Sequence, residues 1–172
     1  MPANEAYTVT INPADFVAVV DNPYFPRIPG DKFVYEGQTA DGFERIELVI
    51  LQETKVVMGI TTTIMRDTVY LDGQVIEDTY DWFAQDKDGN VWYFGELSQS
   101  FENGELASLE GSWKAGVEGA KPGIIMQAAP RVGKTYRQEF FLGEAEDMAE
   151  ILSLTDSATV PAASCNGTCL VT

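Results

Sequence analysis

Three carboxylates in the middle of the chain, Asp67, Asp78 and Glu96, lie in strand-like segments that also carry large aromatic residues. Together with Tyr80 they offer oxygen ligands for a hard cation such as Ca²⁺, and clustered carboxylates can instead share a proton for acid–base chemistry. The aromatic rings beside them suit a small apolar or amphipathic ligand. The candidate ligand-binding residues are Asp67, Asp78, Tyr80, Trp82, Phe94, Glu96 and Trp113, and the candidate metal ligands are Asp67, Asp78 and Glu96.

These side chains belong to a series of segments, from Lys32 onward, in which apolar and polar residues alternate. Asp-Gly or Asn-Gly pairs separate the segments at 41–42, 72–73, 88–89 and 103–104. Closely spaced strands joined by such tight turns predict an antiparallel meander. We therefore expect an all-β fold in which the meander forms a barrel or half-barrel, preceded by a short helix.

The helix is expected within residues 12–20, where Asn12 suits the N-cap and Pro13 the first helical position. The stretch "NPYFPRIPG" that follows contains three prolines and a glycine, which favour an irregular loop. The chain is expected to form a single β domain over 1–172, with an N-terminal arm at 1–31 and the meander at 32–172.

Tight turns fix the register of the strands beside them, so the faces of the sheet can be assigned. A two-residue loop at 72–73 pairs Asp67 with Asp78 and leaves Asp81 on the opposite, solvated face beside Arg66. Two like charges in a cross-strand pair are destabilising unless something compensates them. A bound cation, a shared proton, a neighbouring Arg or Lys, or water could do so.

The next two turns extend this threading. A three-residue loop of Lys87, Asp88 and Gly89 pairs Tyr80 with Glu96, and a two-residue loop at 103–104 pairs Phe94 with Trp113. The predicted inner face then holds the three carboxylates together with all three tryptophans, which are Trp82, Trp92 and Trp113.

The stretch "DKDGN" resembles the start of an EF-hand loop, with Asp86, Asp88 and Asn90 at the first ligand positions. Val91 stands where the sharp turn needs Gly, and Leu97 stands where the bidentate Glu belongs. A hairpin turn therefore explains the stretch better, and Asp86, Asp88 and Asn90 remain a weaker alternative metal site.

Composition excludes several functional classes. The chain has 27 acidic residues against 11 Lys and Arg, a formal charge of −16, which disfavours nucleic-acid binding. It has no His, so His-dependent catalytic triads and most zinc or iron sites are excluded. No apolar run reaches membrane-spanning length, and the first residues do not form a signal peptide.

The two cysteines lie in "CNGTC", on either side of an Asn-Gly turn signal. A three-residue loop of Asn166, Gly167 and Thr168 would bring Cys165 and Cys169 face to face for a disulfide, whereas a two-residue loop would offset the sulfurs and leave two thiols. The final "CLVT" has the pattern of a strand that stops mid-run, so it could pair with a further segment or another copy.

Long stretches of the sequence resemble a family of largely uncharacterised bacterial exported β-proteins. The similar segments cover most of the chain and include "TINPADF", "DTYDWFAQDKDGNVWYFGE", "PGIIM" and "GEAEDMAE". The resemblance implies a mainly β fold and a secreted or periplasmic setting, and it brings no catalytic residues. Such relatives begin with an export signal and continue beyond the equivalent of Thr172, which agrees with a mature form that is incomplete at its C-terminus.

Three functions are consistent with these features of the sequence. The leading hypothesis is an exported, non-enzymatic binding protein that holds a small apolar or amphipathic molecule, or a cation, on the inner face of the sheet. The second is an isomerase- or cyclase-type barrel enzyme that uses the inner carboxylates as acid and base groups. The third is a surface subunit that assembles as a homo-oligomer by strand addition at its C-terminal edge.

Overall fold

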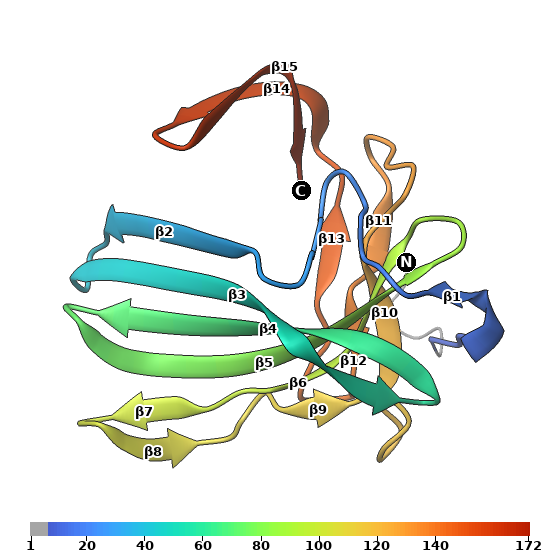
Figure 1. Cartoon of the computed structure of the whole chain (residues 1–172), viewed down its shortest axis with the longest axis horizontal. Coiled ribbons are helices and arrows are strands. Elements are labelled where there is room, and N and C mark those ends of the chain that lie inside the picture. The colour runs from blue at the N-terminus through green and yellow to red at the C-terminus, as the bar shows by residue number, and fades with distance from the viewer. Residues whose placement is uncertain (1–6) are drawn as a thin grey trace.

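The computed structural model describes residues 7–172, so the first six residues of the expected N-terminal arm lie outside the described part of the chain. Its centre is an antiparallel sheet that forms a half-barrel (Figure 1). The main path through this sheet runs β12-β10-β6-β5-β4-β3-β2. In chain order the strands on it are β2 (Lys32–Gln38), β3 (Phe43–Val57), β4 (Ile60–Leu71), β5 (Gln74–Asp86), β6 (Val91–Leu97), β10 (Lys121–Met126) and β12 (Glu139–Phe140).

Shorter strands extend this sheet and flank it. β1 (Phe16–Val17) and β7 (Ser100–Glu102) pair with β5, β8 (Glu105–Ser108) pairs with β7, and β9 (Trp113–Lys114) pairs with β6. Two separate two-stranded sheets follow, β11 (Thr135–Arg137) with β13 (Met148–Glu150) and the hairpin of β14 (Ser153–Val160) with β15 (Ala163–Val171). The all-β prediction is confirmed, and the half-barrel is the form that the meander takes. No helix in the described residues is long and apolar enough to cross a membrane.

The expected N-terminal helix is wrong, because only a 3-10 turn, Pro13–Asp15, is present. Asn12 does cap this turn, since its side chain accepts a hydrogen bond from the Ala14 backbone N–H, and proline does stand at the start. The chain then enters β1, where the ring of Phe16 packs edge-on against that of Phe94, with the ring centroids 5.5 Å apart. Burial of this ring against the sheet therefore outweighs the local helix signal.

The predicted turns are confirmed close to their loops. Leu71 pairs with Gln74 across the 72–73 turn, where Asp72 and Gly73 both have positive φ angles, of 49° and 82°. Asp86 pairs through its backbone with Asn90, and Gly89 is left-handed with φ 90°. These turn residues adopt the backbone conformations that Asp, Asn and Gly tolerate best.

Farther from the turns the predicted register is wrong, because bulges add residues that the threading did not contain. Ile76 is an extra residue in β5, so Asp67 pairs with Thr79, and Asp78 pairs with Thr68. A second bulge in β6 pairs Asp81 with Glu96, in place of the predicted Tyr80. Similar shifts after the turn at 103–104 pair Trp113 of β9 with Glu96, and not with Phe94.

The apolar core runs along the middle of β4, β5 and β6. Its most buried large side chain is Phe94, at 0% exposure, and Phe83 stacks on Tyr93 with ring centroids 4.9 Å apart. Phe25, from the Pro-rich arm, packs edge-on against Phe83 at 5.2 Å. The N-terminal arm thus contributes side chains to the core of the half-barrel.

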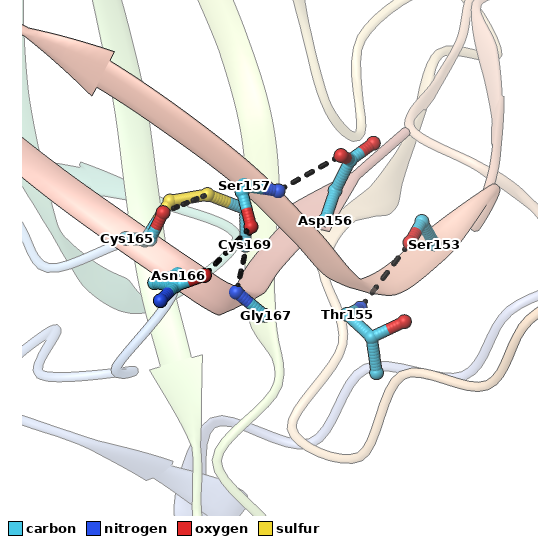
Figure 2. The surroundings of a disulfide bond; sticks show 8 residues. All are labelled: Ser153, Thr155, Asp156, Ser157, Cys165, Asn166, Gly167 and Cys169. Atoms are coloured by element: carbon cyan, nitrogen blue, oxygen red, sulfur yellow. Dashed lines mark hydrogen bonds between the residues drawn. A yellow bond between two sulfur atoms is a disulfide. The ribbon is translucent and has the colours of Figure 1, made fainter.

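The C-terminal hairpin β14–β15 stands apart from the main sheet in Figure 1, and Leu170 contacts the core from it. Cys165 and Cys169 form a disulfide with Cα atoms 5.7 Å apart (Figure 2). Both cysteines lie within β15, so the expected hairpin at Asn166-Gly167 is wrong, and these residues form a bulge inside the strand. There Gly167 donates its backbone N–H to the Ser157 hydroxyl at 2.8 Å.

Candidate functional site

Strand β5 presents two contrasting faces, because paired residues in an antiparallel ladder point to the same side and alternate residues to opposite sides. The face of Asp81, called here the Asp81 face, also carries Asp67 and Glu96 through the observed pairings. The face of Asp78, called the Asp78 face, carries Tyr80 and Trp82. The structure therefore brings Asp67 and Glu96 to one side and places Asp78 on the other.

Asp81 is the most buried carboxylate of the Asp81 face, with 6% of its surface exposed. Its Oδ1 accepts a hydrogen bond from the Tyr93 hydroxyl at 2.5 Å. The pKa of Asp81 is raised to about 7, mainly by burial and in smaller part by the charges of Asp67 and Glu77, against the Tyr93 hydrogen bond and Arg27, which lower it. Near neutral pH a substantial fraction of this carboxyl is therefore protonated, whereas an exposed aspartate is ionised.

Glu96 pairs with Asp81 across the two strands, and its pKa is raised in the same way. Burial raises the pKa of Glu96 to about 8, helped by the negative charges of Asp81 and Glu139. The pKa of Asp67 rises to about 6, first from burial and then from the charges of Glu77 and Asp78. The carboxyls of the Asp81 face thus hold protons at a pH where isolated carboxyls are ionised.

Several buried polar atoms near these carboxyls lack a hydrogen-bond partner among the described residues. They include Asp67 Oδ1, Arg27 Nε and Trp113 Nε1. Trp113 is 4% exposed and its ring lies 5.3 Å from that of Tyr93, so its indole is packed in the interior. The Arg27 guanidinium stacks on the ring of Phe25 at 3.5 Å.

On the Asp78 face, the negative charge of Asp78 is compensated by a neighbouring arginine. Arg66 donates to Asp78 through Nε at 2.7 Å and Nη2 at 2.9 Å, and the Thr68 hydroxyl also donates to this carboxylate. Arg66, Thr68 and Asp78 line an open groove of about 690 Å³ that reaches the β7–β8 hairpin at Phe101. Asp78 therefore serves as the counter-ion of an arginine.

A smaller pocket of about 340 Å³, the Trp82 pocket, opens where β5, β6 and β9 meet. The long strand β3 bends in its second half (Figure 1) and brings Lys55 to it, with Nζ 3.5 Å above the Trp82 ring. The other charged side chains at the pocket are Glu96, Lys114 and Glu118, and its apolar lining includes Trp82, Leu97, Trp113, Val117 and Phe141.

Three of the expected ligand-binding residues, Trp82, Glu96 and Trp113, thus line one pocket. Phe94 is a core residue, and Tyr80 lies beside Arg66, whose guanidinium is 5.6 Å from the ring. Within residues 7–172 no group of three or more Asp, Glu or Cys side chains is arranged to hold a metal ion.

In the loop at residues 86–90, the weaker alternative metal site, the carboxylate of Asp86 is engaged in hydrogen bonds within the turn. Asp86 accepts hydrogen bonds from the backbone and side-chain amides of Asn90, and from the indole N–H of Trp92 at 2.8 Å. Both oxygens of this carboxylate are therefore engaged in closing the hairpin turn. The acidic residues of this loop thus form the rim of a hairpin.

The threading missed Asp81, Tyr93, Arg27 and Glu139 as members of the buried polar cluster. A lone glycine inside a strand pattern is a bulge signal, and Gly95 is one. Had that bulge been placed, Glu96 would have been paired with Asp81. Ile76 has no comparable signal, because an isoleucine suits a regular strand as well as a bulge.

Comparison with known proteins gives no relative to set beside this geometry: no family model, no curated protein and no solved structure matches the sequence.

Proposed function

We propose that this chain is a non-enzymatic binding protein that holds a small amphipathic molecule in the Trp82 pocket. The observation that carries the proposal is the convergence of Trp82, Glu96 and Trp113, from three strands, on one pocket of about 340 Å³. That volume lies at the lower end of the roughly 300–1,000 Å³ usual for small-molecule sites. Apolar walls beside charged groups suit a ligand with an apolar body and a polar end.

The rim of the pocket supports this reading. Leu97 and Val117 are 38% and 42% exposed, so two large apolar side chains face solvent at the mouth. Contiguous exposed apolar surface next to a pocket is typical of ligand sites. An exported setting remains part of the proposal, and the Cys165–Cys169 disulfide agrees with an oxidising compartment.

The test is titration with N-phenyl-1-naphthylamine, a neutral dye that fluoresces in apolar sites. We expect one saturable site, and Leu97→Asp or Val117→Asp should weaken it about fivefold to tenfold, since each removes roughly 1 kcal/mol of apolar contact. Val132→Asp is the matched control, because Val132 is 61% exposed and lines none of the described pockets. Absence of saturable binding in the parent protein would refute the proposal.

An isomerase-type enzyme is the second candidate, supported by the raised pKa values of Asp81 and Glu96 on adjacent strands. Binding is favoured over catalysis because, of these two carboxyls, only Glu96 lines the Trp82 pocket, so a molecule held there meets one of the pair and not both. Assembly through the C-terminal strand is a third candidate, since among residues 7–172 β15 pairs with β14 alone, along one of its two edges.

A further inference from the structure

The Trp82 pocket carries two lysines whose surroundings are unusual for so acidic a protein. Lys55 and Lys114 are two of only 11 basic residues in a chain with 27 acidic ones, and both line this pocket. Neither forms a salt bridge with any residue from 7 to 172. In a chain of charge −16, a pair of cations without a carboxylate partner calls for an explanation.

Both lysines belong to the side of the sheet on which Trp82 lies, Lys114 by its register and Lys55 by its contact with the indole. Lys114 pairs with Gly95, which follows Phe94 in the β6 bulge, on the face opposite to Glu96. Lys55 reaches the same indole from β3, with Nζ 3.5 Å from the ring centroid. The two lysines therefore line the Trp82 pocket from two different strands.

The neighbouring carboxylates do not neutralise this pair. Burial lowers the pKa of Lys55, and the positive charge of Lys114 lowers it further, so the two ammonium groups repel each other. Glu96 belongs by register to the Asp81 face, where Asp81 and Glu139 act on its carboxyl. Glu118 lies at the pocket without reaching either lysine within salt-bridge distance.

From this arrangement we infer that the ligand of the Trp82 pocket is a small organic carboxylate. The carboxylate group would lie between the two lysines, relieve their mutual repulsion and accept charge-assisted hydrogen bonds from both. The apolar body would lie against Leu97, Val117 and Phe141. This inference rests on the proposed function and adds the chemical class of the ligand.

The experiment compares three molecules with the same chain and different ends: octanoate, octanol and octylamine, titrated by calorimetry into the full chain at neutral pH. Octanoate should bind at least about tenfold more tightly than octanol, which corresponds to roughly 1.4 kcal/mol, and octylamine should bind most weakly. Lys55→Gln and Lys114→Gln should each weaken octanoate about tenfold and leave octanol nearly unchanged. Lys134→Gln, at an exposed turn away from the described pockets, should change neither affinity.

The outcomes separate the two claims. If none of the three molecules binds, the pocket is not a site for amphipathic molecules and the proposed function falls with the inference. If octanol or octylamine binds as tightly as octanoate, the pocket binds amphipathic molecules but the carboxylate assignment is wrong. A loss of octanol binding in both lysine variants would show that they act through packing and not through charge, which also overturns the inference.

Discussion

Asp78 and Asp81 are three residues apart in β5, and their side chains meet opposite environments. Asp78 is held by two nitrogens of Arg66, the nearer at 2.7 Å, in an ion pair whose arginine side chain is 44% exposed. Asp81 is 6% exposed and receives one side-chain hydrogen bond, from the Tyr93 hydroxyl. The same residue type is thus neutralised by a cation on one face and by protonation on the other.

The difference shows that alternation along a strand decides which chemistry a carboxylate can support. A carboxylate facing an arginine at the surface stays ionised and contributes little to stability. A carboxylate buried among other acids must hold a proton or destabilise the fold. Since alternation has a period of two, one extra residue in a strand exchanges the two roles.

Substitution of Gly95 tests how strongly the fold fixes the face on which each carboxylate lies, because the bulge at Gly95 decides which face Glu96 reaches. Its φ is 128°, and an added Cβ would collide with the Trp113 carbonyl oxygen and lie 2.9 Å from the Lys114 Cα. We expect Gly95→Ala to lower the free energy of unfolding by about 3 kcal/mol or more, from backbone strain plus displacement of β9. Urea denaturation followed by tryptophan fluorescence measures this loss.

Gly104→Ala is the matched control for that prediction. Gly104 has a φ of 81° in the β7–β8 turn, and a Cβ there meets nothing within 4 Å. Its replacement should cost only the conformational strain, about 1 kcal/mol. Equal losses in the two variants would mean that the contact between Gly95 and β9 does not hold the bulge.

How much could be foreseen from the sequence depends on distance from a turn. The turn at 72–73 and the left-handed Gly89 follow from local residue preferences, so the pairs Leu71–Gln74 and Ala84–Trp92 were predictable. The all-β class follows from the alternation of apolar and polar residues. The short N-terminal helix failed because its residues gain more by packing on β5 and β6 than by completing a helical turn.

The candidate site was predictable only in part. Trp82, Glu96 and Trp113 do meet at one pocket, yet they reach it from two faces of the sheet and not from the single face that the threading assumed. Bulges are chosen by tertiary packing, which the spacing of residues in one strand does not record. Lys55 was out of reach of the threading, because the bend of β3 brings it to Trp82.

The buried carboxylate should make stability depend on pH, and the direction follows from its raised pKa. Asp81, with a folded pKa of about 7, keeps its proton in the folded protein at a pH where the unfolded chain has lost it. Its contribution to stability is therefore full below the unfolded pKa near 4 and is lost as the pH rises through about 7. Glu96, with a pKa of about 8, extends the loss to higher pH.

Asp81→Asn removes this proton uptake and still offers an oxygen to the Tyr93 hydroxyl. We expect the variant to match the parent at about pH 4 and to be more stable by about 1–3 kcal/mol at about pH 9, where the parent carries a buried charge. Denaturant unfolding across that range gives the comparison directly. Parallel pH profiles for the two proteins would show that Asp81 does not hold a proton in the folded state.

Asp78→Asn should change the free energy of unfolding least among these substitutions, and it tests the comparison between the two aspartates most directly. Because the Arg66 side chain is 44% exposed, its ion pair with Asp78 should stabilise the fold by less than about 1 kcal/mol, and added salt should reduce that contribution. The loss can be measured by urea unfolding in low and high salt, and a double-mutant cycle with Arg66→Gln isolates the pair energy. If Asp78→Asn instead stabilised the protein at high pH as Asp81→Asn should, the pairing with Arg66 would not be what separates the two carboxylates. Repulsion among the acidic side chains on both faces of β5 would then outweigh the attraction between Arg66 and Asp78.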